Sequence, residues 1–134
     1  MHVPNRALTI TKAEGARRQV DGAIKALTRG DFDIAVTLAG AAEHMFERPG
    51  RDLWAFMREK AEATGLQTKE MRDSLNAART WLKHPIDADK SLMLERYDAV
   101  EMIMRAMSKL DEWSPRMKRF SKWVYARANE GSFP

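Results

Sequence analysis

Apolar residues recur every three to four positions along most of this chain, and this helical spacing restricts the fold more than any other feature. No segment sustains the apolar–polar alternation of a half-buried strand, and β-branched residues are few. Glycines and prolines divide the pattern into six segments, which we expect to be helices. Their approximate bounds are 11–30, 31–46, 52–63, 68–83, 92–110 and 114–129. The sequence therefore predicts an all-α protein, a single antiparallel bundle of five to six helices.

Two of these helices have clear start signals. Thr11 and Glu14 have the spacing of a capping box, and Ser114 followed by Pro115 places a capping hydroxyl before a first-turn proline. The segments 31–46 and 92–110 are the most apolar ones, so we expect them to face each other at the centre of the bundle. Small residues in the first of these segments would let neighbouring helices approach closely.

Length and composition indicate one ordinary domain. The 134 residues suit a single core, with 1–10 as a flexible N-terminal arm and 130–134 as a short tail. Because the chain has no cysteine, disulfides, thiolate metal sites and a cysteine nucleophile are excluded. No apolar run approaches the ~20 residues of a membrane span, and the N-terminus lacks the apolar stretch of a signal peptide. We therefore expect a cytoplasmic protein without a membrane partner. The net charge of +4 permits a polyanionic partner without requiring one.

The stretch RTWLKHP, residues 79–85, is the one that most suggests chemistry. His84 precedes a proline, so it should lie where the helix ends. A histidine there could move a proton while Arg79 neutralises charge on a phosphate. The simpler interpretation is that Lys83 and His84 are cations at the negative end of a helix. The polar residues on this part of the helix, which we expect to form a mostly basic ridge, are Arg72, Asn76, Arg79 and Lys83.

An arginine, four intervening residues and a histidine at a helix end resemble the R-x4-6-H motif of the HEPN superfamily. That resemblance implies an all-helical bundle, and in many members a metal-independent endoribonuclease that works as a dimer. It would make Arg79 the phosphate-stabilising residue and His84 the catalytic histidine. On an ideal helix, side chains five residues apart diverge by ~140°. The two residues of one chain would therefore not cooperate unless the helix unwinds at its end or a second subunit completes the site, and a composite site between two subunits is the arrangement of that superfamily.

Glu43 and His44 lie outside the apolar face of their helix, on a second face of small and polar residues. We expect both to have a structural role. A buried Glu43 would need a cationic partner such as Arg79 or Lys83, since an unpaired buried charge is costly.

The last helix interleaves cations with aromatic residues and contains no acid before Glu130. Arg116, Arg119 and Lys122 could contact phosphates while an aromatic ring stacks on a base. An apolar face on the same helix should dock on the bundle, and a merely solvated basic face is the alternative. The acidic residues after His84 have the pattern of an ordinary helix start. We expect no metal and no cofactor.

Two functions from different classes fit these features. The leading hypothesis is a HEPN-like protein that binds RNA or nucleotide through Arg79, Lys83 and His84, flanked by Asn76 and Arg72. Such a protein would act as a homodimer, with or without metal-independent cleavage of RNA. The alternative is a non-enzymatic helical module that dimerises or binds a protein partner. Finding the Arg79 guanidinium in an ion pair within the chain would favour the alternative.

Overall fold

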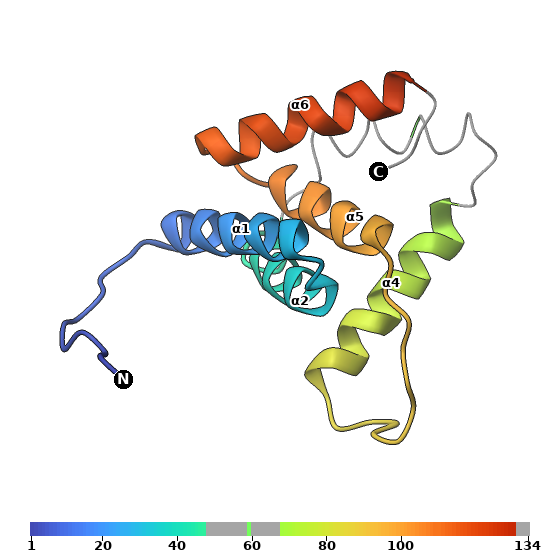
Figure 1. Ribbon diagram of the computed structural model, residues 1–134, viewed down its shortest axis with the longest axis horizontal. Coiled ribbons are helices and arrows are strands. Elements are labelled where there is room, and N and C mark those ends of the chain that lie inside the picture. Colours follow the sequence, from blue (N-terminus) through green and yellow to red (C-terminus); the bar gives the residue numbers. More distant parts are fainter. Residues whose placement is uncertain (48–58, 60–67, 131–134) are drawn as a thin grey trace.

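The computed structural model describes residues 1–47, 59 and 68–130. These residues form five helices and no strand, which confirms the predicted all-α bundle (Figure 1). The helices are α1 (Lys12–Arg29), α2 (Phe32–Glu43), α4 (Thr68–Lys83), α5 (Arg96–Met107) and α6 (Pro115–Asn129). Of the helix expected at 52–63, the structure describes only Glu59, which is helical, and the other residues lie outside the described ones. Across the described ranges, no helix is long and apolar enough to cross a membrane.

The predicted start signals are real caps. The Thr11 hydroxyl accepts a hydrogen bond from the Glu14 amide at 3.1 Å and donates one to the Glu14 carboxylate at 3.2 Å. The Ser114 hydroxyl accepts from the Met117 amide at 3.2 Å, ahead of the first-turn proline. α1 ends at Gly30, whose φ of 80° is left-handed, so glycine suits that position.

The helix expected at 92–110 is shorter at both ends. α5 begins at Arg96 because the Glu95 amide donates to the Asp98 carboxylate at 2.7 Å, which sets the helix start there. At the other end the backbone leaves the helix after Met107 and forms turns through Lys109. The periodicity of the apolar residues continues beyond both helix ends, and this continuation explains the longer prediction.

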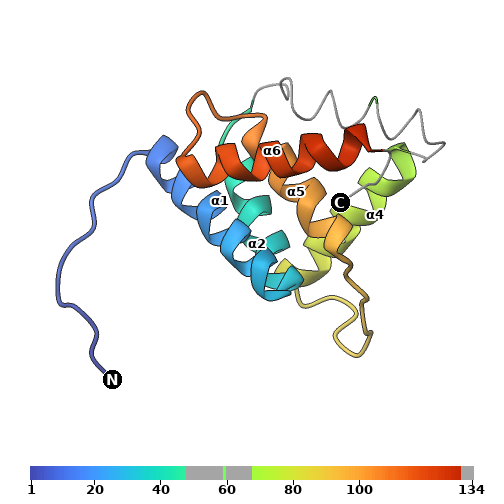
Figure 2. The same cartoon turned by 45° about the horizontal axis from the view of Figure 1, so that its top comes forward.

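α5 is the central helix. It packs against both α2 and α1, and α4 also contacts α2. α6 lies across α1, and Figure 2 shows it covering one side of the bundle. The expected pairing of the second and fifth helices is therefore confirmed. The fully buried large apolar side chains of α5 are Val100, Met102, Ile103, Met104 and Met107.

Residues 1–10 have no regular secondary structure and are exposed throughout. Both Figure 1 and Figure 2 show them extending away from the helices. We refer to residues 1–10 as the N-terminal arm.

Candidate functional site

A buried carboxylate stands at the end of α2 among three cations. Glu43 Oε2 lies 2.7 Å from Arg79 Nη1, and Oε1 lies 3.2 Å from Arg105 Nη2 and 3.4 Å from Lys109 Nζ. The exposed fractions of the four side chains run from 9% for Glu43 to 18% for Lys109. Asn76 joins them, because its Oδ1 accepts from Arg105 Nη1 at 3.0 Å. We call these five residues the Glu43 cluster.

The sequence of α2 makes room for this cluster. At Gly40, one turn before Glu43, an added Cβ would lie 2.5 Å from Arg79 Cδ. The aliphatic part of Arg79 therefore crosses α2 at a point that only glycine leaves open. Lys109 Nζ also donates to the carbonyl oxygens of Glu43 and Phe46, at 3.2 and 3.3 Å. Lys109 thus satisfies carbonyl groups at the C-terminal end of α2, where a helix has no partners of its own for them.

The cluster changes the acidity of two groups. Burial raises the pKa of Glu43, but Arg105, Lys109 and Arg79 together lower it more, so the net pKa lies below its ordinary 4.5. Burial and the nearby Arg79 lower the pKa of His44 below its ordinary 6.5, against the opposing effect of Glu43. Glu43 is therefore ionised and His44 neutral near pH 7.

The basic ridge that was expected on the fourth helix is not one continuous surface, because some of its residues belong to the Glu43 cluster and others are exposed. Arg79 and Asn76 belong to the Glu43 cluster, whereas Lys83 and His84 are exposed. The side chain of Arg72 lies outside the described part of the structure. Arg79 pairs with Glu43, one of the two ion pairs that the sequence suggested for a buried Glu43. Its guanidinium is thus engaged within the chain, the arrangement that favours a non-enzymatic module.

A second group of cations surrounds a groove between α6, α1 and the start of α5. The groove has a volume of about 600 Å³. Its floor is apolar and its rim carries four arginines beside Trp123. The lining residues are Ile24, Leu27, Thr28, Phe32, Arg96, Arg116, Arg119, Phe120, Trp123 and Arg127. We call it the arginine groove.

Two of these arginines lie against the ring of Trp123, which does not neutralise their charge. Arg127 Cζ lies 4.8 Å and Arg96 Cζ 5.9 Å from the centre of the indole ring, within the range of a cation–π interaction. The Nε of Arg127 is buried and has no hydrogen-bond partner among the described residues. Within the same part of the chain, none of the four arginines forms an ion pair. The groove therefore offers positive charge and donors that no carboxylate of the described residues occupies.

Part of this groove was predicted from the sequence. Arg116 and Arg119, expected to form a nucleic-acid surface, line it, whereas Lys122 is exposed and is not part of its lining. The expected docking of an apolar face of the last helix is also present, since Met117 and Phe120 are buried. Arg96 was missed because it comes from α5, and no local pattern predicts which helix start lies beside α6.

Comparison with protein-family models, curated proteins and solved structures found no match to the chain. The resemblance to the HEPN superfamily therefore stays a prediction.

Proposed function

We propose that this chain is an RNA- or nucleotide-binding helical protein whose ligand occupies the arginine groove. One observation carries the proposal: four arginines without an acidic partner in the described structure surround Trp123 over an apolar floor. Arginines in protein interiors and interfaces are usually paired with carboxylates or phosphates. A ligand with phosphate groups would supply the missing anions.

The groove suits a ligand that is anionic at one part and flat and apolar at another. Guanidinium groups bind phosphate oxygens through paired hydrogen bonds, and their planes also stack on nucleobases. Arg116 and Arg119 are the rim residues that we assign to phosphates. Arg96 and Arg127, which lie against the indole, present guanidinium groups on which a base can stack. An apolar floor beneath them accepts the face of a base and excludes water from it.

The proposed role is binding rather than cleavage. To reach a phosphate, Arg79 would have to break its ion pair with Glu43. The buried Glu43 carboxylate would then lose its closest cationic partner, which is costly. His84 is exposed, and its backbone N–H donates to the Thr80 carbonyl at 3.0 Å as part of the helix end. The features at the end of α4 thus support the simpler interpretation of a basic helix terminus.

The test is binding of a labelled single-stranded RNA at fixed salt, followed by fluorescence anisotropy. We expect Arg119→Glu to weaken binding about 10-fold or more, because a charge-assisted hydrogen bond of ~1.5–3 kcal/mol is lost and repulsion replaces it. Lys118→Glu is the matched control, since it reverses a charge on the neighbouring exposed residue outside the arginine groove. Equal losses of RNA affinity in both variants would mean that the chain attracts RNA by non-specific charge rather than through the arginine groove. No binding by the wild-type chain would overturn the proposal.

A further inference from the structure

The N-terminal arm carries apolar side chains that its own bundle leaves in water. Val3 is 66% and Leu8 65% exposed, and Ile10, although its Cδ1 lies beside Gly15 of α1, is still 43% exposed. Pro4 keeps the preceding residue extended and prevents a regular helix from passing through the arm. If another molecule covered these side chains, apolar surface would be removed from water, which is favourable.

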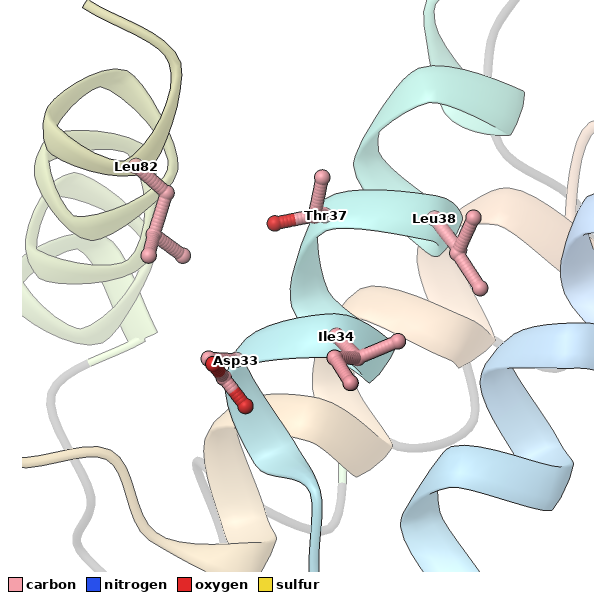
Figure 3. A pocket seen from close by; sticks show the side chains of 5 residues that line it. All are labelled: Asp33, Ile34, Thr37, Leu38 and Leu82. Carbon is pink, nitrogen blue, oxygen red and sulfur yellow. The ribbon is translucent and has the colours of Figure 1, made fainter.

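An apolar groove that could receive such a segment lies between α2 and α4. It is lined by Asp33, Ile34, Thr37 and Leu38 from α2 and by Leu82 from α4, with a volume of about 180 Å³. Figure 3 shows Leu82 and Thr37 on facing sides of the groove, with Asp33 and Ile34 one turn away along α2. Ile34 is 44% exposed, a large fraction for an isoleucine beside two leucines. We call it the α2–α4 groove.

The charges of the two surfaces are complementary. Asp33 is exposed at the α2–α4 groove and forms no ion pair with any described residue. The arm contains a cation, Arg6, and no acidic residue. An arm seated in the groove would bring Arg6 to a carboxylate while its apolar side chains leave water.

The arm is too short to place Leu8 in the groove of its own chain. α1 has 18 residues, so it spans about 27 Å at 1.5 Å per residue. The arm begins at one end of α1, whereas the groove lies on the first turns of α2, beside the other end. Leu8 is three residues from Thr11 and reaches only about 10 Å beyond the start of α1 even when extended. A groove on another molecule has no such restriction.

We propose that the N-terminal arm of one chain packs into the α2–α4 groove of a second copy, with Leu8 against Ile34 and Leu82 and with Arg6 near Asp33. Because each copy has one arm and one groove, reciprocal exchange about a two-fold axis closes a dimer. This proposal concerns a different face from the arginine groove and does not depend on RNA binding.

The absence of cysteine makes a direct test available, because each introduced thiol is the only one in its chain. A Leu8→Cys chain with an enlarging tag is mixed with an untagged Thr37→Cys chain and mildly oxidised. We expect a disulfide-linked dimer of mixed size. The matched control replaces Thr37→Cys by Met93→Cys, a position that is 80% exposed and outside the groove. The mixed dimer should form at least about 10-fold faster than in the control, since docking raises the effective concentration of the thiols.

Two results would overturn the proposal. One is equal cross-linking at Thr37 and Met93. The other is a Leu8→Cys/Thr37→Cys double variant that closes a disulfide within a single chain at high dilution, which would place the arm on its own bundle.

Sedimentation of the full chain supplies a second measurement. We expect a wild-type dimer that becomes monomeric in both Leu8→Asp and Ile34→Asp, while Met93→Asp stays dimeric. All three positions are exposed in the single chain, so the folded bundle should tolerate the changes. A monomeric wild type, or a dimer that persists in both arm and groove variants, would contradict the arm exchange.

Discussion

Glu43 is the residue on which the Glu43 cluster depends, because its carboxylate pairs with Arg79, Arg105 and Lys109. Replacing it by glutamine would remove the negative charge that faces these three largely buried cations. Breaking a buried ion pair by removing one partner typically costs ~3–5 kcal/mol. We therefore expect Glu43→Gln to lower the free energy of unfolding by about that amount at pH 7, measured by urea denaturation.

The same variant should also change the pH dependence of stability. Because the pKa of Glu43 is lowered in the folded chain, its contribution is present above the ordinary value of 4.5 and is lost as the pH falls through the folded value. The difference between wild type and Glu43→Gln should therefore shrink below pH 4.5. Glu47→Gln is the control, since Glu47 is exposed and lies beyond the turn that ends α2. A difference that stays constant down to pH 3 would mean that the carboxylate charge does not stabilise the cluster.

At the scale of the elements, the contact between α2 and α4 depends on the missing side chain at Gly40. Alanine in a helix interior is normally more stable than glycine by ~0.5–1 kcal/mol. At Gly40 the new Cβ would meet Arg79 Cδ at 2.5 Å, so we expect Gly40→Ala to destabilise the chain instead. Gly15→Ala in α1 is the control, because its Cβ would touch only the end of the Ile10 side chain, at 3.3 Å. Thermal unfolding of the two variants should shift in opposite directions, and a stabilised Gly40→Ala would contradict the close crossing.

Local signals predicted most of the elements. α4 has the bounds expected for it, 68–83, because a regular apolar stripe leads to a helix-ending Pro85. The start of α5 was placed too early because the hydrogen bond between Glu95 and Asp98 competes with the apolar periodicity that precedes it. Periodicity shows which face is buried, whereas side-chain hydrogen bonds decide where the helix begins.

The candidate sites were less predictable because they join residues that are distant in the sequence. Arg79 was one of the partners expected for Glu43, since a buried carboxylate needs a cation beside it. Arg105 and Lys109 were not expected at Glu43, because their approach depends on how α5 packs on α2. Arg96 reaches the arginine groove for a similar reason. Charge patterns in the sequence therefore pointed to candidate sites, whereas the packing of the helices determines which residues belong to each site.

At the scale of the whole molecule, we propose that one set of charged residues stabilises the fold and a second set binds a ligand. The Glu43 cluster uses Arg79 within the fold, whereas the arginine groove leaves four guanidinium groups without a carboxylate in the described chain. We therefore expect the chain to bind single-stranded RNA and leave it intact, because the His84 side chain has no hydrogen-bond or ion-pair partner among the described residues. The measurement is incubation of end-labelled RNA with wild type and His84→Ala in the presence of EDTA, followed on a denaturing gel.

Both proteins should bind the RNA equally and return it at full length. The His84→Ala variant removes only an exposed side chain, so a change in fold would not obscure the comparison. Cleavage that survives EDTA and disappears in His84→Ala would instead make the end of α4 a metal-independent active site. In that case Arg79 would have to exchange Glu43 for a phosphate during catalysis, and Arg79→Lys, which keeps the charge but loses the paired donors, should then impair cleavage more than binding.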